Sequence, residues 1–107
     1  MKKLNIIKKE SEINDIIKNG SRIYNKYYYI YNKVNDNNKY YRFCICVSKK
    51  LGNAVERNKN KRQVKDIIDK SNLSFKRNLD YVIILRKEIT SLTYEEKREE
   101  LLKILNA

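Results

Sequence analysis

The run Asp80–Arg86 (DYVIILR) limits the possible folds more than any other stretch, because it is apolar almost without a break. A strand with one face in water alternates apolar and polar residues, whereas a strand covered on both faces is apolar throughout. The run therefore predicts a central strand with other elements packed on both of its sides. No stretch of the sequence is long and apolar enough to cross a bilayer.

Local patterns predict the elements around this strand, through helical spacing, alternation and a capping box at Thr93. We expect helices at 12–18, at 54–70 and from Thr93 onward, and strands at 23–24, 27–32, 41–48 and 80–86. Ser11 is the predicted cap of the first helix, and 35–38 is a predicted turn. The order helix, strand, strand, strand, helix, strand, helix indicates an α+β sandwich in a single domain over residues 1–107.

Alternation along 41–48 separates two faces of that strand. One face is apolar enough for a core and holds Tyr41, Phe43, Ile45 and Val47. The other is mixed, could border a cleft, and holds Arg42, Cys44, Cys46 and Ser48. If Tyr28 and Ile30 enter the same core, Tyr29 and Tyr31 lie on the cleft face. There they could stack on unpaired bases, or they could cover the first helix as ordinary core.

Positive charge is concentrated in the first three-fifths of the chain. Residues 1–65 hold 17 Lys and Arg against 5 Asp and Glu, whereas residues 66–107 hold 8 of each, so the first part carries the whole net charge of +12. Such an excess points to a polyanionic partner, nucleic acid first and an anionic membrane surface second. Residues 1–9 are expected to form a basic tail that serves nonspecific attraction.

The stretch Ser48–Asp66 (SKKLGNAVERNKNKRQVKD) holds seven of these basic residues and two acidic ones. Steps of 100° along the predicted helix place four side chains on one flank, which are Asn58, Lys61, Arg62 and Lys65. Like charges stacked in this way are mildly destabilising in water. We therefore favour phosphate binding over a merely solvated face.

Several kinds of chemistry are excluded by the residues that the chain lacks. Without histidine, it has no Ser-His or Cys-His nucleophile and no histidine acid and base for ribonuclease chemistry. Cys44 and Cys46 lack the second pair of ligands that zinc needs, and two cysteines one residue apart suit a reducing cytoplasm. The glutamates after Thr93 are typical of a capped helix start. No catalytic or metal-binding residue is predicted.

The segment Ser48–Arg62 resembles the signature of the bacterial ribonuclease P protein component, S-K-K-x-G-x-A-V-x-R-N-x-x-K-R. The resemblance implies an α-β-β-β-α-β-α fold with a four-stranded mixed sheet and a left-handed βαβ crossover through the basic helix. It implies binding to the catalytic RNA of ribonuclease P and to the 5′ leader of precursor tRNA. That RNA removes the leader by Mg²⁺-dependent endonucleolytic cleavage, with Mg²⁺ held mainly by RNA, so the protein alone is expected to be inactive.

Matching positions to the family then gives two groups of site residues. RNA-binding residues are expected at Lys49, Lys50, Asn53, Arg57, Asn58, Lys59, Lys61, Arg62 and Lys65. Leader-binding residues are expected at Ile13, Ile17, Tyr29, Tyr31, Cys46 and Ser48.

The sequence also departs from the family pattern. Lys59 stands where the family has arginine, and Ile13 and Ile17 stand where phenylalanine is usual. Asn60 and Gln63 replace apolar residues, which predicts a less firmly docked helix. The alternatives are a structural RNA- or DNA-binding protein of the ribosomal kind and a protein-only nuclease.

Overall fold

The computed structural model describes residues 6–71, 75 and 78–105. Within them lie three α-helices, α1 (Glu10–Asn19), α2 (Ala54–Lys70) and α3 (Tyr94–Leu105). The strands are β1 (Ser21–Tyr24), β2 (Tyr28–Val34), β3 (Arg42–Val47) and β4 (Leu79–Leu85), and the short 3₁₀ helices are η2 (Lys49–Leu51) and η3 (Lys87–Ser91). The predicted order of helices and strands is confirmed, and the predicted boundaries lie within two residues of the observed ones.

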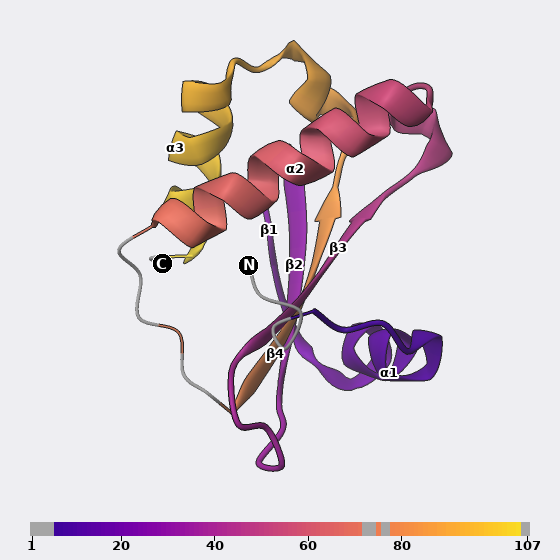
Figure 1. Cartoon of the computed structure of the whole chain (residues 1–107), viewed down its shortest axis with the longest axis vertical. Coiled ribbons are helices and arrows are strands. Elements are labelled where there is room, and N and C mark those ends of the chain that lie inside the picture. The colour runs from indigo at the N-terminus through magenta and orange to yellow at the C-terminus, as the bar shows by residue number, and fades with distance from the viewer. Residues whose placement is uncertain (1–5, 72–74, 76–77, 106–107) are drawn as a thin grey trace.

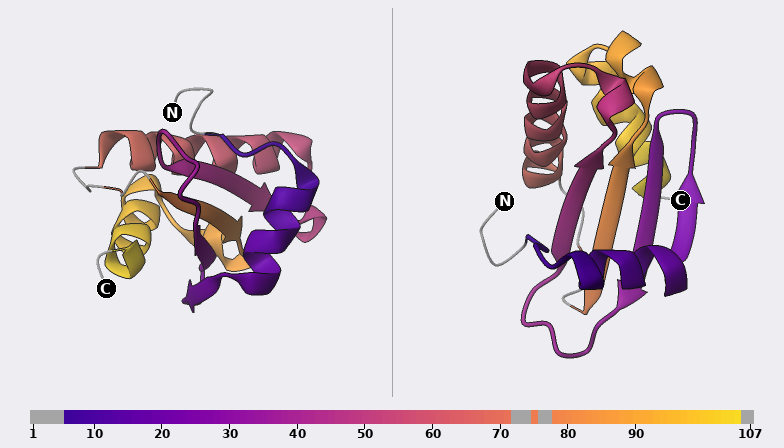
Figure 2. Two further views of the ribbon diagram at one scale, coloured as in Figure 1. Left: turned by 90° about the horizontal axis from the view of Figure 1, so that it is seen from below. Right: turned by 90° about the vertical axis from the view of Figure 1, so that its right-hand side faces the viewer.

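The strands form one mixed sheet in the order β1-β2-β4-β3 (Figure 1). The β1/β2 and β2/β4 pairs are antiparallel, whereas β3 and β4 are parallel neighbours joined through α2. β4 therefore lies inside the sheet, where Ile83 is paired with Ile30 on one side and with Ile45 on the other. Figure 2 shows α1 on one face of the sheet and α3 on the opposite face. The prediction of a central strand covered on both faces is confirmed.

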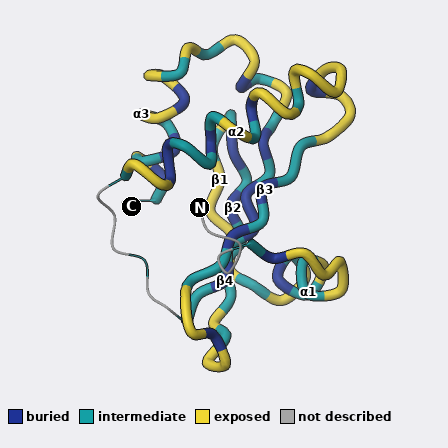
Figure 3. Tube along the Cα trace, viewed as in Figure 1, coloured by how far each residue is buried: buried dark blue, intermediate teal, exposed yellow. Residues whose placement is uncertain are grey.

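The main core lies between the sheet and the inner sides of α2 and α3 (Figure 3). Phe43 is fully buried, stacks on Tyr81 at a ring distance of 4.9 Å, and meets the edge of Phe75 at 5.1 Å. Val64, Ile67 and Ile68 carry α2 onto this core, as helical spacing predicts. Each fully buried side chain of this size contributes roughly 1.5–3 kcal/mol, so this core fixes α2 in place.

A second, smaller cluster lies on the other face, between α1 and the sheet. Its buried members are Ile7, Ile16 and Val82. Ile6 forms a parallel bridge with Phe43, and the Ile7 N–H donates to the Phe43 carbonyl at 2.9 Å. The prediction of a tail is therefore wrong for Ile6 and Ile7, because the edge strand β3 offers free backbone groups for pairing. Residues 1–5 of that tail lie outside the described residues.

The start and end of α1 differ from the prediction. Lys9, not Ser11, occupies the N-cap position, and it makes no side-chain capping bond. The pair Asn19-Gly20 predicts the usual left-handed glycine cap at the end of the helix, but Gly20 has φ −83° and is no such cap. A glycine is needed at position 20 because a Cβ there would lie 2.4 Å from the Asn32 carbonyl oxygen. The close approach brings the end of α1 down onto β2.

The start of α3 is the predicted capping box, which is confirmed. The Thr93 N–H donates to Glu96 Oε1 at 2.9 Å, and the Glu96 N–H donates to Thr93 Oγ1 at 3.2 Å. Helical spacing places Arg98 on one side of this helix with Tyr94, Leu101, Leu102 and Leu105. This prediction is wrong for Arg98, which is exposed, whereas Lys97 is 5% exposed. Lys97 Nζ donates to Gln63 Oε1 of α2 at 2.6 Å, which gives the buried ammonium group a partner.

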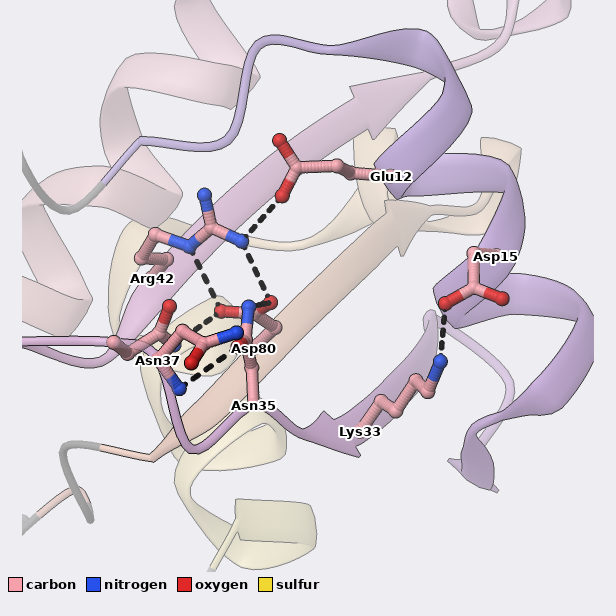
Figure 4. A network of polar contacts seen from close by, with 8 residues as sticks. Glu12, Asp15, Lys33, Asn35, Asn37, Arg42 and Asp80 are labelled. Carbon is pink, nitrogen blue, oxygen red and sulfur yellow. Dashed lines mark hydrogen bonds and ion pairs between the residues drawn. The ribbon is translucent and has the colours of Figure 1, made fainter.

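A polar network ties α1 to the sheet at the end opposite η3 (Figure 4). Arg42 donates through Nε and Nη2 to Asp80 at 2.9 and 2.8 Å, and through Nη2 to Glu12 at 2.6 Å. Asp80 also accepts hydrogen bonds from the side chains of Asn38 and Asn35. Burial disfavours the Asp80 carboxylate, but the bonds from Arg42 and the asparagines outweigh it and lower its pKa below 3.8.

Arg42→Ala is expected to lower the free energy of unfolding by about 3 kcal/mol, because it leaves the buried Asp80 carboxylate without its cation. Urea unfolding at pH 7 measures this loss. The matched control is Lys33→Ala, which breaks the exposed pair with Asp15 and should shift the midpoint little.

The loss of stability in Arg42→Ala is also expected to depend on pH. The Asp80 carboxylate adds stability above its unfolded pKa of 3.8, and this stability is lost as the pH falls through the lower folded value. The difference between wild type and Arg42→Ala should therefore shrink below pH 4. A deficit that stays constant from pH 7 to pH 3 would contradict this role for the pair.

Candidate nucleic-acid interface

The basic helix α2 presents one flank of its surface beside the edge strand β3. Asn53 caps the helix by accepting the Glu56 N–H at 2.9 Å, so this predicted RNA contact has a structural task as well. Lys61 and Lys65 line a hollow together with Cys44 of β3 and Ile7. Asn58 and Arg62 follow on the same flank and are exposed. Helical geometry and packing thus gather four of the predicted RNA-binding residues on one surface.

The cations around this flank have no carboxylate partners in the part of the chain that the structure describes. Among the described residues, no ion pair involves any of the seven predicted cations, which are Lys49, Lys50, Arg57, Lys59, Lys61, Arg62 and Lys65. Lys49 and Lys50 are exposed in η2, immediately before α2. Arg57 is half-buried near the start of α2. Concentrated and uncompensated charge of this kind raises the local potential that attracts a polyanion.

Lys59 lies on the side of α2 that faces α3, away from Lys61 and Lys65. It acts on Lys97 of α3, whose pKa is lowered first by burial and then by repulsion from Lys59. The neighbouring position on this flank, Gln63, accepts the hydrogen bond from Lys97. The structure therefore places Lys59 and the pair Lys61 and Lys65 on different sides of α2.

The two polar substitutions on α2 have opposite effects on its docking. Gln63 forms an interhelical bond with Lys97 that an apolar residue could not form. Asn60 is 2% exposed and donates to the Glu56 carbonyl, but its Oδ1 has no partner within the described part of the chain. An unsatisfied buried oxygen costs about 1–3 kcal/mol. The predicted loosening of α2 therefore has a physical basis only at Asn60.

The predicted leader-binding residues lie on the α1 face of the sheet, but not all together. Ile13, Ile17, Tyr31 and Cys46 pack around one cluster between α1 and the strands. Tyr29 lies nearer the start of β2 than Tyr31 does. The guanidinium of Arg86 lies 4.8 Å from the Tyr29 ring centroid. Ser48 is exposed beyond the end of β3.

The thiols of Cys44 and Cys46 connect the cleft face to the basic helix. Both are free, and their sulfur atoms lie 3.5 Å apart on the same face of β3. The hydrogen bond from Cys44 and, less strongly, the charge of Lys61 together lower the pKa of Cys46 to about 7, although burial opposes them. Lys61 is thus close enough to the floor of the cleft to place positive charge at its edge.

Sequence reasoning missed three residues of this face, which are Arg22, Tyr24 and Arg86. In the antiparallel β1/β2 pair, Tyr24 is opposite Tyr29 and Arg22 is opposite Tyr31, so these side chains share a face. The sequence does show alternation along β1 and β2, which determines the residues on each face of a paired strand. Only the register of β1 against β2, however, shows that Tyr24 lies beside Tyr29 and Arg22 beside Tyr31.

The described residues contain no group of three or more His, Cys, Asp or Glu side chains that could hold a metal ion. None of the helices within 6–71 and 78–105 combines the length and the apolar character needed to cross a membrane. A cation-rich flank of α2, without carboxylate partners among the described residues, beside a tyrosine-bearing sheet face is typical of a small α+β protein that binds polyanions.

Comparison with known proteins identifies the family. The family model described as ribonuclease P matches residues 1–107. A curated ribonuclease P protein component from Streptococcus pneumoniae serotype 4 is 38% identical over 105 residues, which cover 98% of this chain and 85% of the relative. The chain belongs to the ribonuclease P protein family, and it is therefore an RNA-binding protein of tRNA processing.

Solved structures agree with this assignment. A Staphylococcus aureus RNase P protein mutant with defective mRNA degradation activity superposes with a TM-score of 0.87 at 32% identity, covering 97% of this chain and 87% of that one. The RNase P protein from Thermotoga maritima gives a TM-score of 0.79 at 31% identity, covering 88% of each chain. The mixed α+β fold predicted from the sequence is confirmed.

Arg62→Gln should weaken binding to the RNA partner and reduce the slope of log K against log salt by about 0.9, the value for one lost phosphate contact on a duplex. Arg98→Gln is the matched control, since Arg98 is equally exposed but lies among the glutamates of α3. Titrations at several salt concentrations measure both slopes. Equal losses for the two variants would show that only net charge matters, and not the flank of α2.

Proposed function

We propose that this chain is the protein subunit of ribonuclease P. In this proposal it binds the catalytic RNA and the 5′ leader of precursor tRNA, and it assists the Mg²⁺-dependent endonucleolytic removal of the leader in the cytoplasm. The observation that carries the proposal is the cation flank of α2, which has no carboxylate partner among the described residues and shares a hollow with Cys44 on the tyrosine-bearing face of the sheet. Family membership supports the same role.

The proposed role of α2 is electrostatic. Catalytic RNA and substrate both carry phosphates, so they repel each other where they meet. Lys61, Arg62 and Lys65 would lie between the two polyanions and offset part of that repulsion. Their side chains remain available for this because none of them is paired with a carboxylate within the described residues.

The proposed role of the sheet face is to hold the single-stranded leader. Tyr31 is half-buried against α1, so its ring is held in place while part of it stays accessible. A ring held in this way can stack on an unpaired base whatever its identity. Ile13 and Ile17 cannot stack, so they would close the cleft by apolar contact while the tyrosines carry the base contacts.

Mg²⁺ would be held by the RNA and the substrate, where it activates water and stabilises the leaving oxygen. The described part of the protein offers no suitable cluster of ligands, and the sequence has no histidine for acid or base catalysis. We therefore propose that the protein alone does not cleave RNA. A structural RNA- or DNA-binding role remains the alternative, and selective retention of ribonuclease P RNA over ribosomal RNA in a pull-down distinguishes the two.

Reconstitution with a bacterial ribonuclease P RNA and a precursor tRNA tests the whole proposal. The protein should accelerate cleavage most at low Mg²⁺, because both the protein and the metal ion supply positive charge. Rates with and without protein, measured over a series of Mg²⁺ concentrations, give this dependence. Equal acceleration at every concentration would contradict the electrostatic role, and cleavage by the protein without RNA would contradict the absence of catalytic residues.

Tyr31→Ala should weaken holoenzyme binding of precursor tRNA roughly 5-fold or more, the loss expected for one stacked base, and leave binding of mature tRNA unchanged. Tyr31→Phe is the matched control, because it keeps the ring and should keep the affinity. Thermal unfolding of both variants checks that the cluster beneath Tyr31 remains folded. An equal loss for precursor and mature tRNA would remove the leader role of this residue.

A further inference from the structure

The α1 face of the sheet is only partly covered. In the right-hand view of Figure 2, α1 crosses one end of the strands, and the sheet face beyond it is open while α3 lies behind the sheet. The strand register places four residues in one row across this face of the sheet, from edge to edge. They are Tyr24 on β1, Tyr29 on β2, Ile84 on β4 and Cys46 on β3.

The row begins at the basic helix and ends on an exposed aromatic ring. At its β3 end, the Cys46 sulfur lies 3.5 Å from that of Cys44, which lines a hollow together with Lys61 and Lys65 of α2. At its β1 end, Tyr24 is 60% exposed. Three steps between neighbouring strands separate the two ends, a span of about 14 Å. A single RNA strand that left the α2 flank and crossed the sheet along this row would reach Tyr24 at the far edge.

Tyr24 is built into a group of stacked rings and cations. Its ring centroid lies 5.8 Å from that of Tyr29, with the planes tilted by 47°. The guanidinium of Arg22 lies 4.9 Å from the Tyr24 ring centroid and 5.8 Å from that of Tyr29. The guanidinium of Arg86, which follows β4, lies 4.8 Å from the Tyr29 ring centroid. Two arginines therefore hold two tyrosines in place at the edge of the sheet.

The exposure of Tyr24 separates this group from ordinary core. Tyr28, on the opposite face, is fully buried and donates its hydroxyl to the Lys97 carbonyl at 2.9 Å. Tyr24 has no such cover, and every residue of β1 is exposed (Figure 3). Arg22 forms no ion pair with a carboxylate in the part of the chain that the structure describes. An accessible ring beside an unneutralised guanidinium matches a nucleotide, which offers a base to stack and a phosphate to pair.

We propose that Tyr24 and Arg22 form a stacking site for an unpaired RNA base, which extends the leader path over β2 to the edge strand β1. Tyr24 stacks on the base, and Arg22 faces the adjoining phosphate. The inference rests on the proposed function, because it takes the leader to be the RNA strand on this face. Since the row starts beside α2, where catalytic RNA and substrate meet in that proposal, the β1 site receives leader nucleotides farther from the cleavage site.

The test uses the reconstituted holoenzyme and precursor tRNAs whose leaders are shortened one nucleotide at a time. Tyr24→Ala should lower affinity for the longest leader by about 5-fold or more. The loss should vanish below one leader length and be absent for mature tRNA. Arg22→Gln should lower the same affinity and also weaken its salt dependence. Tyr24→Phe, which keeps the ring, should bind as the wild type does. Thermal unfolding checks that every variant stays folded, as expected for two exposed residues.

The wild-type series separates this inference from the proposed function. If the wild type gains affinity from the leader and Tyr24→Ala gains as much at every length, the β1 site is overturned and the leader role stands. If Tyr24→Ala loses equally on mature tRNA, the residue serves another contact and the site is also overturned. If the wild type itself gains nothing from the leader, the leader role fails and the β1 site fails with it.

Discussion

Burial of β4 on both faces is the constraint on which the rest of the structure depends. Ile83 is fully buried toward the main core, while Val82 is fully buried toward α1, so one strand needs a cover on each side. The α2 and α3 helices supply one cover and α1 supplies the other. Because α1 covers only one end of its face, the remainder stays open beside the flank of α2. The two surfaces proposed to bind RNA are thus a consequence of how a single apolar strand is buried.

The charge distribution depends on the same packing. Like charges along one flank of a helix repel each other, and nothing in the described part of the chain neutralises them. The apolar contacts of Val64, Ile67 and Ile68 hold α2 against this repulsion. The unpaired oxygen of Asn60 weakens that hold, and the Gln63–Lys97 bond strengthens it. Binding to a polyanion removes the repulsion, so RNA stabilises the folded protein as well as being bound by it.

Most of the fold could be predicted from the sequence because its elements carry strong local signals. The apolar run at β4, the alternation along β3 and the Thr93 capping box each specify structure within a few residues. The errors fall where tertiary contacts decide the outcome, as with Ile6 and Ile7 docking on an edge strand, and Lys97 replacing Arg98 at a helix interface. The cation flank follows from helical geometry alone. Tyr24 and Arg22 could not be placed without the register of β1 against β2.

The position of Lys59 shows why sequence spacing alone does not define a binding surface. Lys59 is adjacent in sequence to Asn58, yet a step of 100° moves it to the flank that faces α3. There it repels the buried ammonium of Lys97, which Gln63 holds by a hydrogen bond. Lys61, two residues later, returns to the β3 side and acts on the thiol of Cys46. Motif residues that are contiguous in the chain therefore divide between a structural interface and an open surface, and the packing of α2 decides which residue has which role.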